Sequence, residues 1–196
     1  MERKATHPFY SHMTSDDFLN LKAVVLFIVN YCREISYFHV FKILYFAEGK
    51  HCARYGRRIM NDSFHALPEG PVPSALYDAV KIAAGDKQRT GDYPLLALIS
   101  DALSVKDKYI LTAKEQPDMD YLSKSDIECL TESIKENKDV PKGELSAKSH
   151  DSAWGYAWVN TDKSIDDIRM AQAAGASDGT IEYIKEHRLI NSLLGA

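Results

Sequence analysis

The sequence predicts a mainly α-helical α+β fold, in which a compact helical domain surrounds a buried central helix and carries a small antiparallel β element. Three observations predict it. The segment 37–55 is apolar on most sides, which is typical of a helix that is buried all round. Other segments repeat apolar residues at helical spacing behind a capping Ser or Thr. Only 63–67 and 98–114 have a strand-like pattern bounded by turn residues.

The first two predicted helices have clear start and stop signals. Thr14 or Ser15 caps the first helix, which is expected to end near residue 33. Ser36 caps the central helix, and Gly56 is expected to end it. The apolar residues of the first helix recur at helical spacing: Phe18, Leu21, Val24, Val25, Ile28, Val29 and Cys32.

A strand over 63–67 leads into a proline-rich turn, and a third helix over 74–84 follows and ends at Gly85. Two interpretations of the turn stay open. It sets the direction of the chain, or it is an exposed docking element that loses little entropy on binding. The candidate partner-binding residues in this turn are Glu69, Gly70, Pro71, Val72 and Pro73.

The stretch 86–121 has the least regular pattern. Residues 86–94 are polar and are predicted to form a surface loop. A hairpin is expected next, with arms 98–105 and 109–114 on either side of a Lys-Asp-Lys turn.

A capping box then starts a further helix, because Ser123 is followed three residues later by Asp126. This helix carries Ile127, Leu130 and Ile134 on one face. A turn is expected over 140–143 and a short helix over 144–149.

The last part of the chain is predicted to hold two more helices. Ser164 is expected to cap a helix over 165–174. Ser177 is expected to cap the final helix, which reaches about residue 193.

Composition excludes several classes of protein. The 196 residues carry a net charge of −4, which argues against a dedicated nucleic-acid binder. No apolar run is long enough for a transmembrane helix, and the N-terminus lacks the apolar segment of a signal peptide. The three cysteines form no CxxC motif, which suits a reducing compartment. We therefore expect a cytoplasmic protein without a membrane partner.

Catalytic and metal-binding motifs are absent from the sequence. It contains no Gly-x-Ser-x-Gly, no HExxH and no glycine-rich phosphate loop. Of the seven histidines, His39, His51, His65, His150 and His187 are scattered along the chain, and only tertiary folding could gather them. We therefore predict no enzyme, with no catalytic residue, cofactor or metal.

Glu48 and Cys52 are the two residues on which a hydrolase could depend. They share one face of the central helix with Tyr45. Glu48 is either part of an acid–base or partner-binding pocket, or a carboxylate hydrogen-bonded within the fold, because an unpaired buried carboxylate is costly. We favour the structural role. Cys52 follows His51 directly, and adjacent helical side chains point about 100° apart, so these two do not face each other.

A local basic patch surrounds the end of the central helix. Lys50, Arg54, Arg57 and Arg58 could contact an acidic partner or nucleic acid. Alternatively, cations are favourable near the C-terminus of a helix, which fits Arg54 best. Arg57 and Arg58 follow the expected helix end and stay candidates for partner contact.

Three blocks, in a fixed order, carry a family resemblance. The first contains Lys42, Ile43, Leu44, Tyr45, Phe46, Ala47, Glu48, Gly49, Gly56 and Ile59. The second contains the strand 64–67 with Gly70, Pro71, Val72, Leu76 and Tyr77. The third contains Leu122, Ser123, Asp126, Ile127, Leu130, Leu145, Ser146, His150, Ala153 and Trp154. Together they resemble the Panacea domain of SocA-like antitoxins.

The resemblance implies an antitoxin that binds a cognate protein toxin and blocks it. Relatives include a proteolytic adaptor, which delivers its toxin to a cytoplasmic protease, and phage-associated proteins. A DNA-binding autoregulator, acting on its own promoter, is the alternative, and a hydrolase using Glu48 or Cys52 is a third possibility. The motif residues expected to have structural roles are Tyr45, Phe46, Glu48, Gly49, Tyr77, Asp126, His150 and Trp154.

The resemblance also suggests a domain organisation. Residues 1–13 are predicted to be a flexible tail, and 14–158 a Panacea-like domain. Within it, 86–121 is expected to be a variable loop and hairpin insertion. Residues 159–196 are expected to form a helical extension packed on the same domain, and either 86–121 or 159–196 could set partner specificity.

Trp154, Tyr156 and Trp158 form an aromatic series with two interpretations. In a strand all three would face one way, whereas in a helix only the two tryptophans would share a side. They could anchor a partner, or they could close the edge of the core. The family resemblance favours a core role for Trp154, and Trp158 is the better candidate for an interface.

Overall fold

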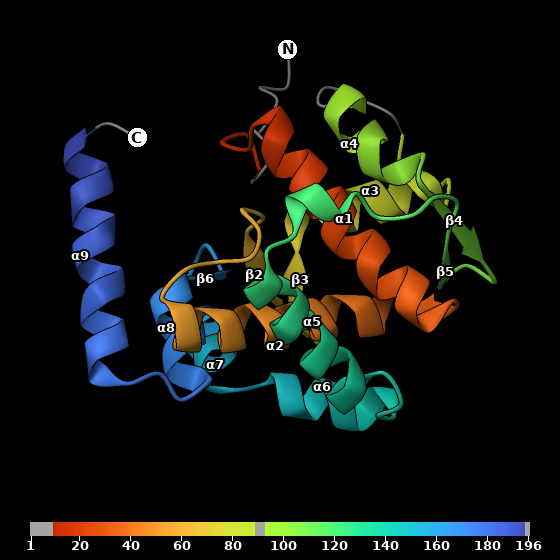
Figure 1. The fold of residues 1–196 in the computed structure, drawn as a ribbon. Helices are drawn as coiled ribbons and strands as arrows, with labels where there is room; N and C mark the ends of the chain where they lie inside the picture. The colour runs from red at the N-terminus through yellow and green to blue at the C-terminus, as the bar shows by residue number, and fades with distance from the viewer. Residues whose placement is uncertain (1–9, 89–92, 195–196) are drawn as a thin grey trace, which may run out of the picture.

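The computed structural model describes residues 10–88 and 93–194 and confirms a mainly helical α+β fold around a buried central helix (Figure 1). The described chain contains nine α-helices and two three-stranded antiparallel sheets. In order, the elements are α1 Ser15–Cys32, β1 Ile35–Ser36, α2 Tyr37–Tyr55, β2 Phe64–Leu67, β3 Gly70–Pro73, α3 Ser74–Ala83, α4 Tyr93–Ser100, β4 Leu103–Lys106, β5 Ile110–Ala113, the 3-10 helix η1 Met119–Tyr121, α5 Lys124–Asn137, α6 Lys142–Ser149, α7 Ser152–Val159, β6 Ser164–Ile165, α8 Asp167–Ala173 and α9 Asp178–Leu194.

The helix α2 is the centre of the molecule. It packs against α5, α6, α8 and β3, and most of its side chains are buried. The hydroxyl of Ser36 accepts the backbone N–H of His39, and Gly56 ends the helix in the left-handed conformation with φ 65°. Both predicted ends of the central helix are thus confirmed.

The segment before α1 differs from the predicted tail. Tyr10 and Met13 are buried, and the Tyr10 hydroxyl donates to the Asp78 carboxylate at 2.8 Å. The ring of Tyr10 also meets Phe18 edge to face, with centroids 6.2 Å apart. The prediction of a flexible tail is therefore wrong for residues 10–13, because their apolar side chains complete the core. Residues 1–9 lie outside the described residues.

The proline-rich segment is a strand and not an exposed turn. β3 pairs with β2 in antiparallel register, and the turn between them is formed by Pro68 and Glu69. Gly70, Pro71 and Pro73 are buried, so the expectation of an exposed turn is wrong for these three. Proline is tolerated here because β3 lies at the edge of the sheet. A proline in an edge strand can turn its missing N–H away from the neighbouring strand, so that no hydrogen bond between strands is lost.

The predicted hairpin of the other sheet is confirmed as β4 and β5. Its turn places Asp107 and Lys108 at positive φ, and the backbone N–H of Tyr109 donates to the Lys106 carbonyl at 3.1 Å. The first arm begins later than predicted, because residues 98–100 belong to α4. Leu96 and Ile99 are both buried, and their separation of three residues fits one helical face. The end of the predicted loop 86–94 is also helical, and residues 89–92 lie outside the described residues.

Two predicted boundaries in the last third of the chain are wrong. Ser164 does not cap a helix: it belongs to β6, where the neighbouring Ile165 pairs with Phe64 of β2. Asp166 caps α8 instead, since its carboxylate accepts the N–H of Arg169. The expected turn 140–143 is shorter than predicted, because α6 already begins at Lys142.

The C-terminal helices pack on α2 in their first part. Ile181 and Ile184 of α9 are buried together with Cys52 of α2. The second half of α9 stands away from the other helices, with Leu189 and Leu193 exposed (Figure 1). None of the helices in 10–88 and 93–194 is sufficiently long and apolar to cross a membrane.

Candidate functional site

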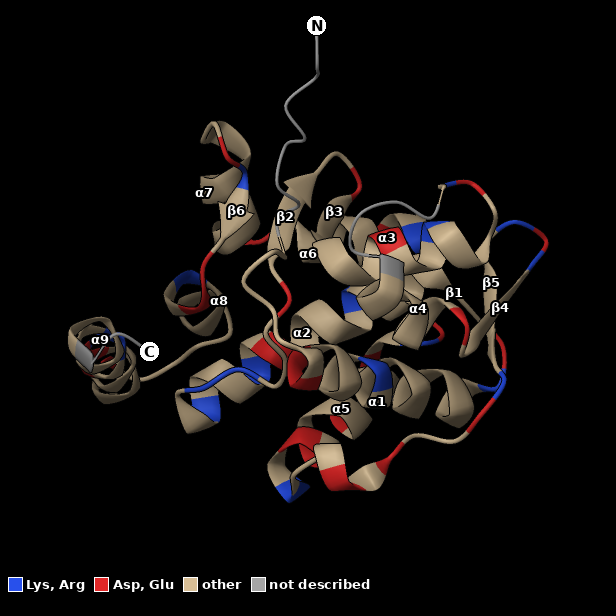
Figure 2. Cartoon of the chain, turned by 90° about the horizontal axis from the view of Figure 1, so that it is seen from above, with Lys and Arg blue, Asp and Glu red and all other residues tan. Residues whose placement is uncertain are grey.

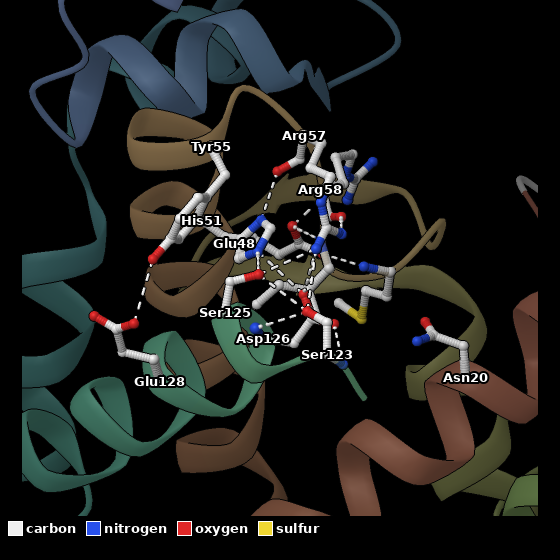
Figure 3. A network of polar contacts seen from close by, with 12 residues as sticks. Asn20, Glu48, His51, Tyr55, Arg57, Arg58, Ser123, Ser125, Asp126 and Glu128 are labelled. Atoms are coloured by element: carbon white, nitrogen blue, oxygen red, sulfur yellow. Dashed lines mark hydrogen bonds and ion pairs between the residues drawn. The ribbon is translucent and has the colours of Figure 1, made fainter. Parts of the chain in front are cut away.

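Glu48 is the centre of a polar network at the end of α2 (Figure 3). Its side chain has no exposed surface, and its two carboxylate oxygens accept the backbone N–H groups of Ile59 and Met60 at 3.0 and 2.9 Å. The Arg58 Nε lies 3.9 Å from the carboxylate. Burial raises the pKa of Glu48, while Arg58 and the two N–H groups act in the opposite direction. This carboxylate holds the loop after Gly56 against α2, as expected for a structural role.

Asp62 plays a similar part for α3 and was missed by the sequence analysis. Its carboxylate accepts the backbone N–H groups of Ala75 and Leu76 at 2.9 and 3.0 Å. The residue at the start of α3, Pro73, has no side-chain capping bond, so Asp62 supplies the acceptor from another loop. Burial raises the pKa of Asp62 to about 6. No local sequence signal marks a cap that lies so far from its helix.

His51 is buried between α2 and α5. Its Nδ1 lies 2.8 Å from the Arg57 carbonyl, and its Nε2 lies 3.0 Å from the Ser125 hydroxyl and 3.1 Å from Asp126 Oδ1. Burial alone would raise the pKa of Asp126, but hydrogen bonds from His51 and Ser123 and the charge of Arg57 lower it. The serine and the carboxylate face the same ring nitrogen, so this is not the relay of a nucleophilic triad.

Neither residue of the hydrolase hypothesis is accessible. The Cys52 side chain is fully buried, and burial raises the pKa of its thiol to about 12. A thiol in such a site stays protonated near neutral pH, whereas the thiolate is the nucleophile. Tyr45 also turns away from Glu48, because its hydroxyl donates to Asp151 at 2.9 Å.

The basic patch at the end of α2 is largely neutralised by α5. Arg54 pairs with Glu132 at 2.6 Å, and Lys50 pairs with Glu136 at 2.8 Å. Arg58 is turned inward, with an N–H donating to the Asp62 carbonyl, whereas the Arg57 side chain is half exposed. Figure 2 shows basic and acidic residues interspersed over the elements in view. The patch therefore offers little free positive charge for nucleic acid.

Two rings of α7 and the ring of His150, which follows the end of α6, form a column that we call the aromatic ridge and define as His150, Trp154 and Trp158. The centroids of His150 and Trp154 are 3.9 Å apart, and those of Trp154 and Trp158 are 5.2 Å apart. Both pairs are close to parallel, with interplanar angles of 20° and 14°. The ammonium of Lys163 lies 3.8 Å from the centroid of the Trp158 ring. The helical alternative of the aromatic series is the one observed, and Tyr156 lies on the other side of α7.

A comparison with protein families matches residues 40–155 to the model of the SocA-like antitoxin, Panacea domain. The chain belongs to this family. The match extends from the start of α2 into α7 and covers more than half of the 196 residues. Comparisons with curated proteins and with solved structures yield no match.

Family-motif residues of this Panacea domain, together with Asp151 between them, join its elements together. Asp151, which receives the Tyr45 hydroxyl, also accepts the backbone N–H groups of Ala153 and Trp154 at the start of α7. Gly49 leaves room for α8, because a Cβ there would lie 3.3 Å from that of Ala174. These contacts explain why small or hydrogen-bonding residue types occur at these positions.

Gly70 packs closely against Ser149 and Lys42. Gly70 has φ 101°, and a Cβ at this position would lie 2.2 Å from the Ser149 hydroxyl and 2.9 Å from Lys42 Cε. The Lys42 ammonium is buried and donates to the Pro71 carbonyl at 2.8 Å. Burial lowers the pKa of Lys42 to about 7, with smaller and opposing effects of Glu69 and Lys142.

The predicted partner-binding residues lie on two separate surfaces. Arg57 and Arg58 follow the end of α2, where Arg57 contacts the start of α5 and Arg58 is turned inward. Trp158 lies in the aromatic ridge, which is joined to the β2–β3 turn because the Trp154 indole N–H donates to the Leu67 carbonyl at 3.0 Å. In that turn Glu69 is exposed and pairs with Lys142 at 2.7 Å. Val72, the remaining predicted residue of the segment 69–73, is partly buried. Glu69 is therefore the exposed residue of this segment.

Proposed function

We propose that this Panacea protein is an antitoxin that neutralises a cognate protein toxin by binding it directly. The observation that carries the proposal is the family match over residues 40–155. The buried positions of Glu48 and Cys52 support it further, because a protein without accessible reactive groups there acts more readily by binding than by hydrolysis. The toxin and the antitoxin would meet in the cytoplasm.

Neutralisation has two possible routes. In the first, the antitoxin covers the active surface of the toxin. In the second, it presents the toxin to a cytoplasmic protease. The exposed aromatic side chains on α7 support direct contact in either route, since tryptophan is enriched among the residues that dominate binding energy.

Co-expression tests the proposal. The open reading frame beside the gene is expressed alone and, if it arrests growth, together with this chain or with an empty vector. We expect the chain to restore growth and to co-purify with the toxic protein. If a toxic neighbour arrests growth equally in the presence of well-expressed, folded chain, the proposal is wrong.

The half-life of the toxin then separates the two routes. Occlusion predicts an unchanged half-life and a stable complex. Delivery predicts that the antitoxin shortens the half-life and that removing the host protease restores it. A salt series of gel shifts on the upstream DNA checks autoregulation, which the ion pairs around Arg54 do not favour.

A further inference from the structure

The aromatic ridge on α7 is exposed and has unused hydrogen-bonding capacity. Trp158 is 36% exposed and its neighbour Val159 is 80% exposed. Within the described part of the chain, neither the indole N–H of Trp158 nor the ring nitrogens of His150 have a hydrogen-bond partner. An exposed tryptophan with a free donor is well suited to anchor a partner.

The geometry of the stacked rings decides which ligand chemistry the aromatic ridge can attract. The rings stack face to face, so their negatively polarised faces are covered and their positively polarised edges point outward. Lys163 covers a face of Trp158 and donates to the Trp158 carbonyl at 3.0 Å. The surface therefore combines positive ring edges with a cation.

Lys163 is a cation without an ion pair in the part of the chain that the structure describes. Lys50 and Arg54, in contrast, form ion pairs. Two acidic side chains close to the ridge in the sequence make other hydrogen bonds. Asp151 accepts the Tyr45 hydroxyl and the N–H groups that begin α7, and Asp162 accepts the N–H of Ser164. The ridge thus presents an indole N–H without a hydrogen-bond acceptor and an ammonium group without an ion pair among the described residues.

We propose that the aromatic ridge and Lys163 form the docking site for an acidic segment of the toxin. This inference rests on the proposed antitoxin function and names the surface and the chemistry that carry it. Carboxylates of the partner would meet the edge of Trp158, its indole N–H and the Lys163 ammonium, which are complementary in charge and hydrogen bonding. Nucleic acid is the poorer ligand, because the stacked faces leave little ring surface for bases.

The test begins with the unmodified chain and the purified product of the adjacent toxic reading frame. Both tryptophans of the chain lie in the ridge, so 5-fluorotryptophan labelling gives fluorine NMR signals from this surface alone. We expect addition of the toxin to shift or broaden the Trp158 signal, assigned with Trp158→Phe. Binding that leaves both signals unchanged overturns the proposal.

The second part of the test measures the affinity of variants of the chain for the toxin. Trp158→Ala is expected to weaken toxin binding by at least about tenfold, as for a central aromatic anchor. Lys163→Glu is expected to weaken binding by roughly threefold or more and to reduce its dependence on salt. Binding within about twofold of the unmodified chain for both variants would exclude the ridge as the docking site.

A pair of glycine variants guards against loss of folding. Gly155 lies on α7 beside the ridge, and a Cβ added there meets nothing within 4 Å. Gly155→Glu therefore adds a carboxylate side chain to the surface beside the ridge without disturbing the core. It should weaken binding of the toxin and leave the melting temperature of the chain unchanged. Gly179→Glu on α9 is the matched control, since a Cβ there meets only the Ser177 hydroxyl at 3.8 Å. Equal binding by both variants would contradict the proposal.

Two further outcomes are distinguishable. If the unmodified chain neither binds nor neutralises the toxin, the antitoxin function fails and the ridge proposal with it. If the unmodified chain binds and the ridge variants bind equally well, only the ridge proposal fails. A single-stranded oligonucleotide that shifts the ridge signals, when the toxin binds and leaves them unchanged, would show that the ridge takes nucleic acid in place of the toxin, which also overturns the proposal.

Discussion

At the scale of single residues, buried carboxylates organise the backbone of this protein. Glu48 and Asp62 each accept two backbone N–H groups from a segment that has no partner of its own. Such groups are costly to bury without acceptors. The two side chains therefore fix the loop between α2 and β2 and the start of α3, and substitution is expected to affect stability before it affects binding.

Glu48→Gln tests this structural role. The amide keeps one acceptor but turns an N–H₂ group toward Ile59 or Met60, so one backbone N–H loses its acceptor. We expect the free energy of unfolding to fall by about 1–3 kcal/mol, with toxin binding intact below the melting temperature. Urea denaturation measures the change, and Glu136→Gln on the exposed side of α5 is the control. Loss of toxin binding by folded Glu48→Gln would argue for a role in the binding site.

Gly70→Ala and Gly85→Ala form a matched pair of substitutions. Both glycines have positive φ, 101° and 77°, so each alanine suffers backbone strain of about 1–2 kcal/mol. At Gly85 the added Cβ enters open space, whereas at Gly70 it collides with Ser149. We therefore expect Gly70→Ala to destabilise the protein by roughly 2 kcal/mol more than Gly85→Ala, measured by thermal or urea unfolding. Equal effects would show that packing around Gly70 relaxes freely.

At the scale of secondary structure, local signals predicted where helices begin, whereas tertiary contacts decided which short segments are strands. The capping residues Thr14, Ser36 and Ser123 correctly predict where α1, α2 and α5 begin, because a cap and its N–H lie within three residues. β3 and β6 were predicted as a turn and as helix. Each contains few residues, and only pairing with β2 makes them strands.

The second half of α9 is expected to contribute little to the stability of the protein. Leu189, Ile190 and Leu193 are exposed, so this part of the helix buries little apolar surface. Deleting residues 189–196 is expected to change the free energy of unfolding by less than about 0.5 kcal/mol. Circular dichroism during urea unfolding measures it, and Ile184→Ala, which removes buried apolar surface from the same helix, is the contrasting variant. A large loss on deletion would mean that these residues pack against the domain.

At the scale of the whole molecule, one buried lysine couples stability to pH. Burial lowers the pKa of Lys42 to about 7, whereas the unfolded chain holds this proton until about pH 10. Unfolding therefore takes up a proton between these values, and stability should rise with pH by up to about 4 kcal/mol from pH 7 to pH 10. Lys42→Met should flatten this rise relative to the unmodified chain in urea titrations. An identical pH dependence in both proteins would show that Lys42 keeps its proton when folded.

The division of the molecule into a Panacea-like domain and a C-terminal extension stays a prediction. The structure adds that α8 and the beginning of α9 pack directly on α2, through Gly49 and Cys52. The family match ends at residue 155, just before Trp158. The aromatic ridge thus crosses from the matched part of the chain into the extension, and the role of the extension in partner specificity stays a prediction.

By itself, the sequence determined the family, the helical class, the central helix and most helix starts of this protein. These properties depend on residue order and on contacts within one or two turns of helix, which the sequence displays directly. The tertiary structure alone decided that Glu48 and Asp62 bind distant N–H groups, that Gly70 to Pro73 form a buried strand, and that Lys163 caps the stacked tryptophans. Such features join residues from different elements, and their free energy comes from burial and charge that exist only once the elements have packed.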